Sequence, residues 1–87
     1  MDIEDENISE LQIKKIEEMR LVQLEEIMSM LKVEERLLLL MRYFDGLSIS
    51  EIQHLTKLGA SAIKMRLKRS RERMLMIYSE KNNALDD

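Results

Sequence analysis

The sequence predicts an all-α fold, a small bundle of four or five helices. Its 87 residues contain no proline and only two glycines, Gly46 and Gly59, so almost nothing interrupts a helix. Leu, Met, Glu, Lys and Arg are abundant, and all five favour helices. Apolar residues make up 45% and charged residues 36%, a balance that suits one small globular domain with a modest core.

The first third of the chain predicts two helices. Asn7 and Glu10 have capping-box spacing, so a helix is expected to start there. Residues 8–31 have a helical pattern with two apolar faces, which one exposed helix would not carry. We therefore expect a joint near Arg20–Val22. One face contains Ile13, Ile16, Leu24, Ile27, Met28 and Leu31, and the other Ile8, Leu11, Met19, Val22 and Met30.

A link at Lys32–Val33 precedes the next predicted helix, Glu34–Phe44. Gly46 suits the left-handed position that ends it. Its core candidates are Leu37, Leu38, Leu40, Met41 and Phe44.

The third helix is predicted at Ile49–Thr56. Ser48 and Glu51 have the spacing of a second capping box, which would open this helix. Ile52 and Leu55 are its expected buried pair, with Leu47 just ahead of them.

The last helix is predicted at Ala60–Tyr78, after a turn at Lys57–Gly59. At 100° per residue, one side carries the core stripe Ile63, Leu67, Ser70 and Met74. The other sides carry two basic rows, one of Lys64, Lys68 and Arg71, and the other of Arg66, Arg69 and Arg73. Two short consecutive helices, the second of them basic, predict a helix-turn-helix that reads DNA.

The charge distribution agrees with a polyanionic partner. Residues 1–31 carry nine acidic and three basic side chains, whereas residues 60–73 carry six basic and one acidic. Attraction to phosphate is screened within about 8–10 Å at physiological salt, so the local cluster matters more than the net charge of −3. A solvated helix face is the plainer interpretation of the same residues.

Other function classes find no support in the sequence. Cysteine is absent, so disulfides and thiolate metal sites are excluded, and a reducing compartment is compatible with the composition. The location expected is cytoplasmic. The longest apolar run, Leu37–Met41, is far short of the ~18 residues of a membrane span. The acidic start is unlike a secretory signal. His54, the sole histidine, has no partner at metal-ligand spacing, and neither a phosphate loop nor a nucleophile–base pair is visible. We therefore expect no cofactor and no enzyme activity.

Several segments, in order and at constant spacing, resemble region 4 of bacterial RNA polymerase sigma factors, in particular the extracytoplasmic-function type. The resemblance covers Val22 to Met76. Residues 39–48, Leu-Leu-Met-Arg-Tyr-Phe-Asp-Gly-Leu-Ser, resemble the apolar-Arg-Tyr-x-x-Gly-Leu-Ser signature of the family, and Glu51-Ile52 matches its Glu-Ile pair. Residues 61–67 and 69–71 resemble its recognition helix.

The resemblance implies a domain organisation and a function. Residues 1–21 would be an acidic linker with the first helix, 22–80 the helix-turn-helix domain and 81–87 a disordered tail. The last helix would enter the major groove of the upstream (−35) promoter element. Base edges would be contacted by Lys64, Met65, Lys68 and Arg69, and phosphates by Ser61, Ala62, Arg66 and Arg71, with Lys57 and Arg42 as weaker candidates.

The implied partners are double-stranded promoter DNA, core RNA polymerase through its β flap, and an anti-sigma factor, with no membrane. The family often has Pro where Lys32 stands, Gly where Lys57 stands, and Ser or Pro where Gly59 stands. Lys57 is therefore expected to need a strained backbone or a shifted turn. These differences bear on promoter preference more than on the fold.

Two alternatives to this interpretation stay open. One is another helix-turn-helix transcriptional regulator. The other is a sigma-like decoy that binds an anti-sigma factor instead of DNA, for which the acidic first third and the surplus apolar face at Ile8–Val22 speak. The 87 residues hold no counterpart of the promoter-opening region 2, which is compatible with a fragment, a split sigma subunit or a stand-alone protein.

Overall fold

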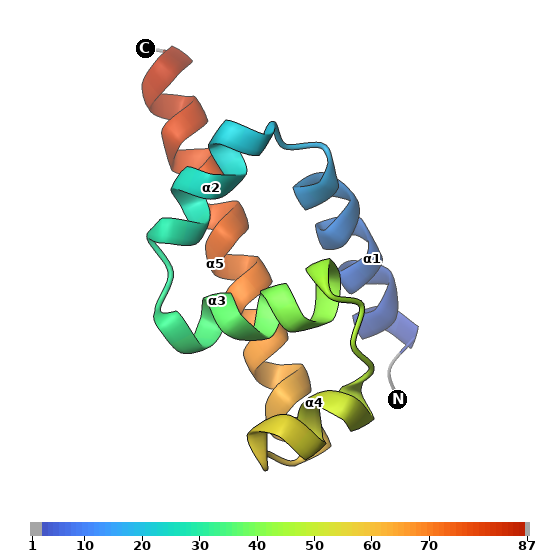
Figure 1. The fold of residues 1–87 in the computed structure, drawn as a ribbon. Coiled ribbons are helices and arrows are strands. Elements are labelled where there is room, and N and C mark those ends of the chain that lie inside the picture. Colours follow the sequence, from blue (N-terminus) through green and yellow to red (C-terminus); the bar gives the residue numbers. More distant parts are fainter. Residues whose placement is uncertain (1–2, 87) are drawn as a thin grey trace.

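The computed structural model describes the backbone of residues 3–86 and the side chains of residues 10–81. Within that range the chain forms five α-helices and one π-helical turn, with no strand (Figure 1). They are α1 (Ile3–Glu17), α2 (Leu21–Ser29), α3 (Val33–Leu39), η1 (Leu40–Phe44), α4 (Ile49–Thr56) and α5 (Ala60–Asp86). The predicted all-α class is confirmed.

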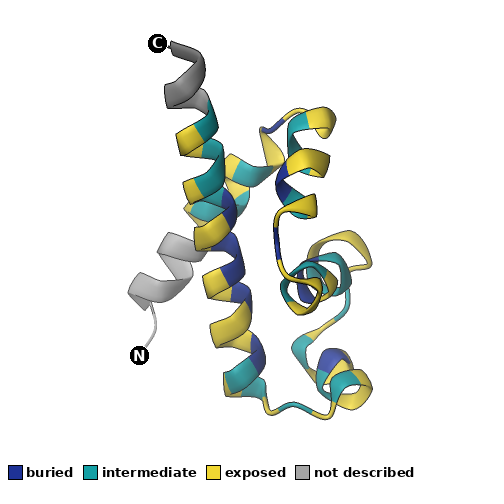
Figure 2. Ribbon diagram, turned by 90° about the vertical axis from the view of Figure 1, so that its left-hand side faces the viewer, coloured by how far each residue is buried: buried dark blue, intermediate teal, exposed yellow. Residues whose placement is uncertain are grey.

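Helix α5 is the centre of the molecule, because α1, α2, α3 and α4 all pack against it. Its buried residues lie along the side that faces α2, α3 and α4, and its other side is exposed (Figure 2). The predicted stripe Ile63, Leu67, Ser70 and Met74 is buried. The other buried apolar residues are Met19, Ile27, Leu31, Leu38, Leu39 and Ile52. One helix therefore supplies both the core and a long solvent face.

The predicted joint between the first two helices is confirmed, since α1 ends at Glu17 and α2 begins at Leu21. The predicted start at Asn7 is wrong, because α1 already begins at Ile3. The second apolar face divides between core and solvent: Met19 in the link turns into the core, while Leu11 and Val22 are 68% and 66% exposed. The prediction for Ile8 lies outside the described side chains.

The predicted helix over residues 34–44 is two elements. Helix α3 passes into the wider turn η1, where the Asp45 N–H donates to the Leu40 carbonyl at 2.9 Å. Leu38 and Leu39 are buried, whereas the core candidates Leu37 and Phe44 are 47% and 75% exposed. The run Leu37–Met41 is apolar all round, so packing against α5 decides which leucines turn inward.

The start of α4 is as predicted. Ser48 Oγ accepts from the Glu51 N–H at 3.0 Å, and the Ser48 N–H donates to Glu51 Oε1 at 2.8 Å. Gly46, at φ 69°, takes the predicted left-handed conformation. Ile52 is buried, but Leu55 is 61% exposed, so only one of the expected pair enters the core.

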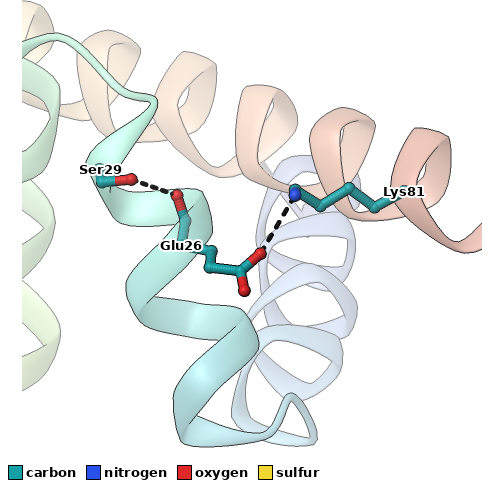
Figure 3. A network of polar contacts seen from close by, with 3 residues as sticks. All are labelled: Glu26, Ser29 and Lys81. Atoms are coloured by element: carbon teal, nitrogen blue, oxygen red, sulfur yellow. Dashed lines mark hydrogen bonds and ion pairs between the residues drawn. The ribbon is translucent and has the colours of Figure 1, made fainter.

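Helix α5 continues past its predicted end at Tyr78 to Asp86, and the range 81–87 expected to be a disordered tail is helical as far as Asp86. One contact along this extension joins it to α2. The Lys81 ammonium lies 3.1 Å from Glu26 Oε2, and the Glu26 carbonyl accepts from Ser29 Oγ at 2.6 Å (Figure 3). Both charged side chains are well exposed, so this ion pair adds little stability.

Candidate nucleic-acid interface

A tight turn connects α4 to α5, and the two helices pack on each other. Ile52 and Ile63 are both fully buried. Lys57 closes α4 in the left-handed conformation at φ 65°, and its N–H donates to the Gln53 carbonyl at 2.8 Å. Thr56 Oγ1 accepts from the Leu58 N–H at 3.3 Å and donates to the Ile52 carbonyl at 2.8 Å. Of the two outcomes expected at Lys57, the structure shows the strained backbone, as a single residue with positive φ.

The first turn of α5 leaves backbone donors available. Its hydrogen-bond ladder begins with the Ile63 N–H, which donates to the Gly59 carbonyl at 3.1 Å. The N–H groups of residues 60–62 have no acceptor within the helix, because the carbonyls four residues earlier precede it, as at any helix start. Ser61 is exposed, and Ala60 and Ala62 are half-buried with little side-chain bulk. A phosphate could approach this turn closely.

The solvent face of α5 holds all four residues expected to read bases. Met65 is 53% exposed, and its cationic neighbours are exposed as well. The exposed cations of this helix between residues 60 and 73 are Lys64, Arg66, Lys68, Arg69 and Arg73. Glu72 is the one acidic residue in that stretch. The exposed side of α5 is therefore positively charged, and the core holds the helix in place on its other side. An α-helix has about the width of the major groove of DNA.

Arg71 does not belong to this exposed face. It is 5% exposed, and its guanidinium donates to Gln12 Oε1 at 3.1 Å and to Tyr43 Oη at 2.6 Å. On the helical wheel Arg71 lies as close to the core stripe as the exposed Arg66 does, on the opposite flank, and it is buried because α1 and η1 cover that flank. Its position does not support a phosphate contact. Gln12 and Tyr43, its partners among the described side chains, lie 59 and 28 residues away in the sequence, where no pattern could have shown them.

The two weaker candidates also differ from each other. Arg42 is half-buried, and its Nη1 donates to the Leu47 carbonyl at 2.9 Å, so it holds the link before α4. Lys57 is exposed at the turn between the two helices. Arg73 is exposed beside Arg69 on the wheel, although the predicted contacts did not include it. The sequence could have indicated Arg73 as a contact residue, because it follows Arg66 and Arg69 at helical spacing in the second basic row.

The described residues show no feature of another kind of site. His54 is exposed on α4. No group of three or more His, Cys, Asp or Glu residues within the described part of the chain could hold a metal ion. Among these residues, no helix is long and apolar enough to span a membrane.

Comparison with known proteins points to one family. A protein-family model described as "Sigma-70, region 4" matches residues 21–74, more than half of the chain. The match runs from the first residue of α2 through the basic stretch of α5 and leaves out α1. No curated protein and no solved structure matches significantly.

Proposed function

Because the chain belongs to the sigma-70 region 4 family, we propose that it recognises the −35 element of promoters and binds core RNA polymerase in transcription initiation. Region 4 is a DNA-binding transcription-factor domain and not an enzyme family. Work on promoter DNA would place the protein in the bacterial cytoplasm. The extracytoplasmic-function type is the part of the family that its motifs resemble most.

The observation that carries this proposal is the exposed basic face of α5. Its five exposed cations lie on the flanks and the far side of the helix from the buried stripe, so the helix can enter a groove without unpacking the domain. A helix in the major groove has a phosphate strand on each side and base edges between them. The two basic rows and the residues between them fit that geometry.

The base-reading roles follow from side-chain chemistry. Lys64, Lys68 and Arg69 are donors that suit the O6 and N7 acceptors of guanine. Met65 can make only apolar contact, for which the thymine methyl group is the matching partner.

Phosphate contacts are assigned to the edges of the same surface. Arg66 lies in the second basic row, Lys57 at the turn, and Ser61 with the Ala62 N–H at the start of α5. Arg42 keeps a secondary role because its guanidinium already holds the Leu47 carbonyl. Arg71 is left out of the interface because it is buried.

The protein partners are proposed from the family alone. We assign binding of the β flap of RNA polymerase mainly to the helices that precede α4, and an anti-sigma factor would cover these same surfaces. The exposed apolar side chains Leu11, Leu21 and Val22 also leave room for the decoy alternative, in which protein binding replaces DNA binding.

A binding experiment separates these functions. The 87-residue chain, immobilised, is offered core RNA polymerase and the isolated β flap without DNA, and is separately titrated with duplexes from a randomised library. Polymerase binding together with enrichment of one duplex sequence is expected. DNA binding without polymerase binding would indicate an ordinary helix-turn-helix regulator, and the absence of both would favour the decoy.

Substitution of Lys68 tests the reading face, by which we mean the exposed side of α5 that carries Lys64, Met65, Lys68 and Arg69. Lys68→Ala is expected to weaken binding to the enriched duplex by about 1–3 kcal/mol and to relax the base preference at one position. Lys15→Ala removes the same charge from an exposed position of α1 and serves as the control. An equal loss on all duplexes would reassign Lys68 to a phosphate contact.

A further inference from the structure

Arg71 joins three elements at one point. It belongs to α5 and is buried, with only 5% of its surface exposed. Different guanidinium nitrogens reach Gln12 of α1 and Tyr43 of η1. Nε donates to Gln12 Oε1 at 3.1 Å, and Nη1 donates to Tyr43 Oη at 2.6 Å. Figure 1 shows α1 and the end of α3 that continues as η1 beside the middle of α5.

Burying a guanidinium costs free energy, so the hydrogen bonds that it makes in a buried position restrain the elements that supply its partners. Taking such a charge out of water costs several kcal/mol unless hydrogen bonds satisfy its donors. The rigid, planar fork of arginine can hold two partners in fixed directions, which lysine cannot do. Gln12 and Tyr43 come from different helical elements, so Arg71 fixes the directions of both relative to α5.

An apolar pocket lies beside this cluster. A cavity of about 220 Å³ lies between α1, α2, η1 and α5. Mostly apolar side chains line it, among them Ile13, Ile16, Met28, Leu40 and Met74, and Tyr43 also contributes to its wall. Beside this unfilled space, the directional hydrogen bonds of Arg71 add to the apolar contacts of the core in setting the angle at which α1 and η1 meet α5.

The position of Arg71 along α5 links it to the reading face. It lies three residues after Lys68 and two after Arg69, within one helical turn of both. The rotation of α5 about its axis at this level decides where these two side chains point. A contact that fixes the rotation here therefore fixes the presentation of the base-reading residues.

We propose that Arg71 is a positioning residue for DNA recognition, acting through Tyr43 and Gln12 to set the rotation of α5. The inference rests on the proposed function, because it concerns how well α5 reads a promoter. It also makes α1, which lies outside the matched residues 21–74, a working part of the DNA-reading unit.

Tyr43→Phe is the most informative variant, because it removes one hydroxyl and no charge. The 87-residue chain and its variants are titrated with the duplex enriched from the randomised library and with a scrambled duplex of the same length. Titrations are run at several salt concentrations and at a temperature where circular dichroism shows full folding. The two readouts are the ratio of the two affinities and the dependence of affinity on salt.

Tyr43→Phe is expected to lower the affinity ratio by roughly two- to tenfold with an unchanged salt slope, the size of coupling that residues in one network show. Gln12→Ala should act in the same direction, and the double variant should lose less than the product of the two single losses. An unchanged ratio for a fully folded Tyr43→Phe protein would overturn the positioning role and leave a purely structural one.

The pair Arg71→Gln and Arg73→Gln supplies the matched control for charge. Each removes one cation from α5, but Arg73 is exposed. A salt slope that falls by about 1 for Arg71→Gln would make Arg71 a phosphate contact and overturn the inference. If the unaltered chain discriminated no duplex, the proposed function would fail and the positioning role with it. If the chain discriminates and Tyr43→Phe does not alter the ratio, the inference alone fails.

Discussion

Ile63 shows how one residue can serve both the core and the reading face. It is fully buried beside Ile52, and its neighbours in sequence, Lys64 and Met65, are exposed. The apolar packing of Ile63 therefore holds the side of α5 away from the residues proposed to read bases. Its contribution to folding can be measured apart from DNA binding.

Ile63→Ala is expected to lower the free energy of unfolding by about 2–5 kcal/mol, because it deletes buried methyl groups and leaves a cavity. Met65→Ala on the same helix, at 53% exposure, is the control and should change stability by no more than about 0.5 kcal/mol. Urea unfolding followed by circular dichroism measures both. Equal stability of the two variants would contradict the assignment of the core stripe.

Glu51 predicts a pH dependence at the residue scale. The backbone N–H of Ser48, and then its side chain, lower the pKa of the Glu51 carboxyl below its ordinary value of 4.5 through hydrogen bonds. Because the folded pKa lies below the unfolded one, this stabilisation is complete above the unfolded value and disappears as pH falls through the folded value. The stability gap between the unaltered chain and Glu51→Gln should therefore shrink below about pH 4.5. Urea unfolding across that range measures it, and a gap that stays constant would contradict the cap.

At the scale of elements, the turn between α4 and α5 depends on a lysine in an unfavourable conformation. Lys57 has φ 65°, a region that costs an L-residue roughly 1–2 kcal/mol and that glycine adopts freely. Part of any gain from glycine is lost to the greater freedom of the unfolded chain.

Lys57→Gly is therefore expected to stabilise the domain by about 0.5–1 kcal/mol. Lys57→Ala removes the same charge but keeps the Cβ, so it should not stabilise. Thermal unfolding of the two variants separates backbone strain from charge. A lower melting temperature for Lys57→Gly than for Lys57→Ala would show that the positive φ of Lys57 does not destabilise the domain.

At the scale of the whole molecule, charge is divided between two ends of the sequence. The net charge is −3, yet the exposed face of α5 is basic. The molecule is small, with principal extents of 44 × 28 × 17 Å, so the acidic first third acts on an approaching duplex at low salt. Net charge alone would therefore mislead about the partner.

The logarithm of DNA affinity is expected to fall linearly with the logarithm of salt concentration, with a slope of about −0.9 per phosphate neutralised. Three to five contacts from α5 and Lys57 would give a slope of roughly −2.7 to −4.5. Fluorescence anisotropy between low and physiological salt measures it. Weak binding that does not depend on salt would instead agree with the decoy alternative.

Local sequence signals fixed most of the elements. The capping pair Ser48 and Glu51 set the start of α4, Gly46 took the left-handed position, and the 3.6-residue period placed Ile63, Leu67, Ser70 and Met74 in the core. These features depend on residues a few positions apart, which is why the sequence predicts them. The same period placed the exposed cations of α5.

The tertiary structure decided what depends on distant residues. The all-apolar run Leu37–Met41 has no preferred side, so packing on α5 chose Leu38 and Leu39 for the core. Arg71 has the same residue type and nearly the same helical spacing as its exposed neighbours, and only the arrival of Gln12 and Tyr43 buries it. The sequence by itself determined the all-α class, the start of α4, the family and the basic face of α5. Contacts between residues far apart in the chain determined which of its cations face solvent, because burial depends on what packs against a side chain and not on its own chemistry.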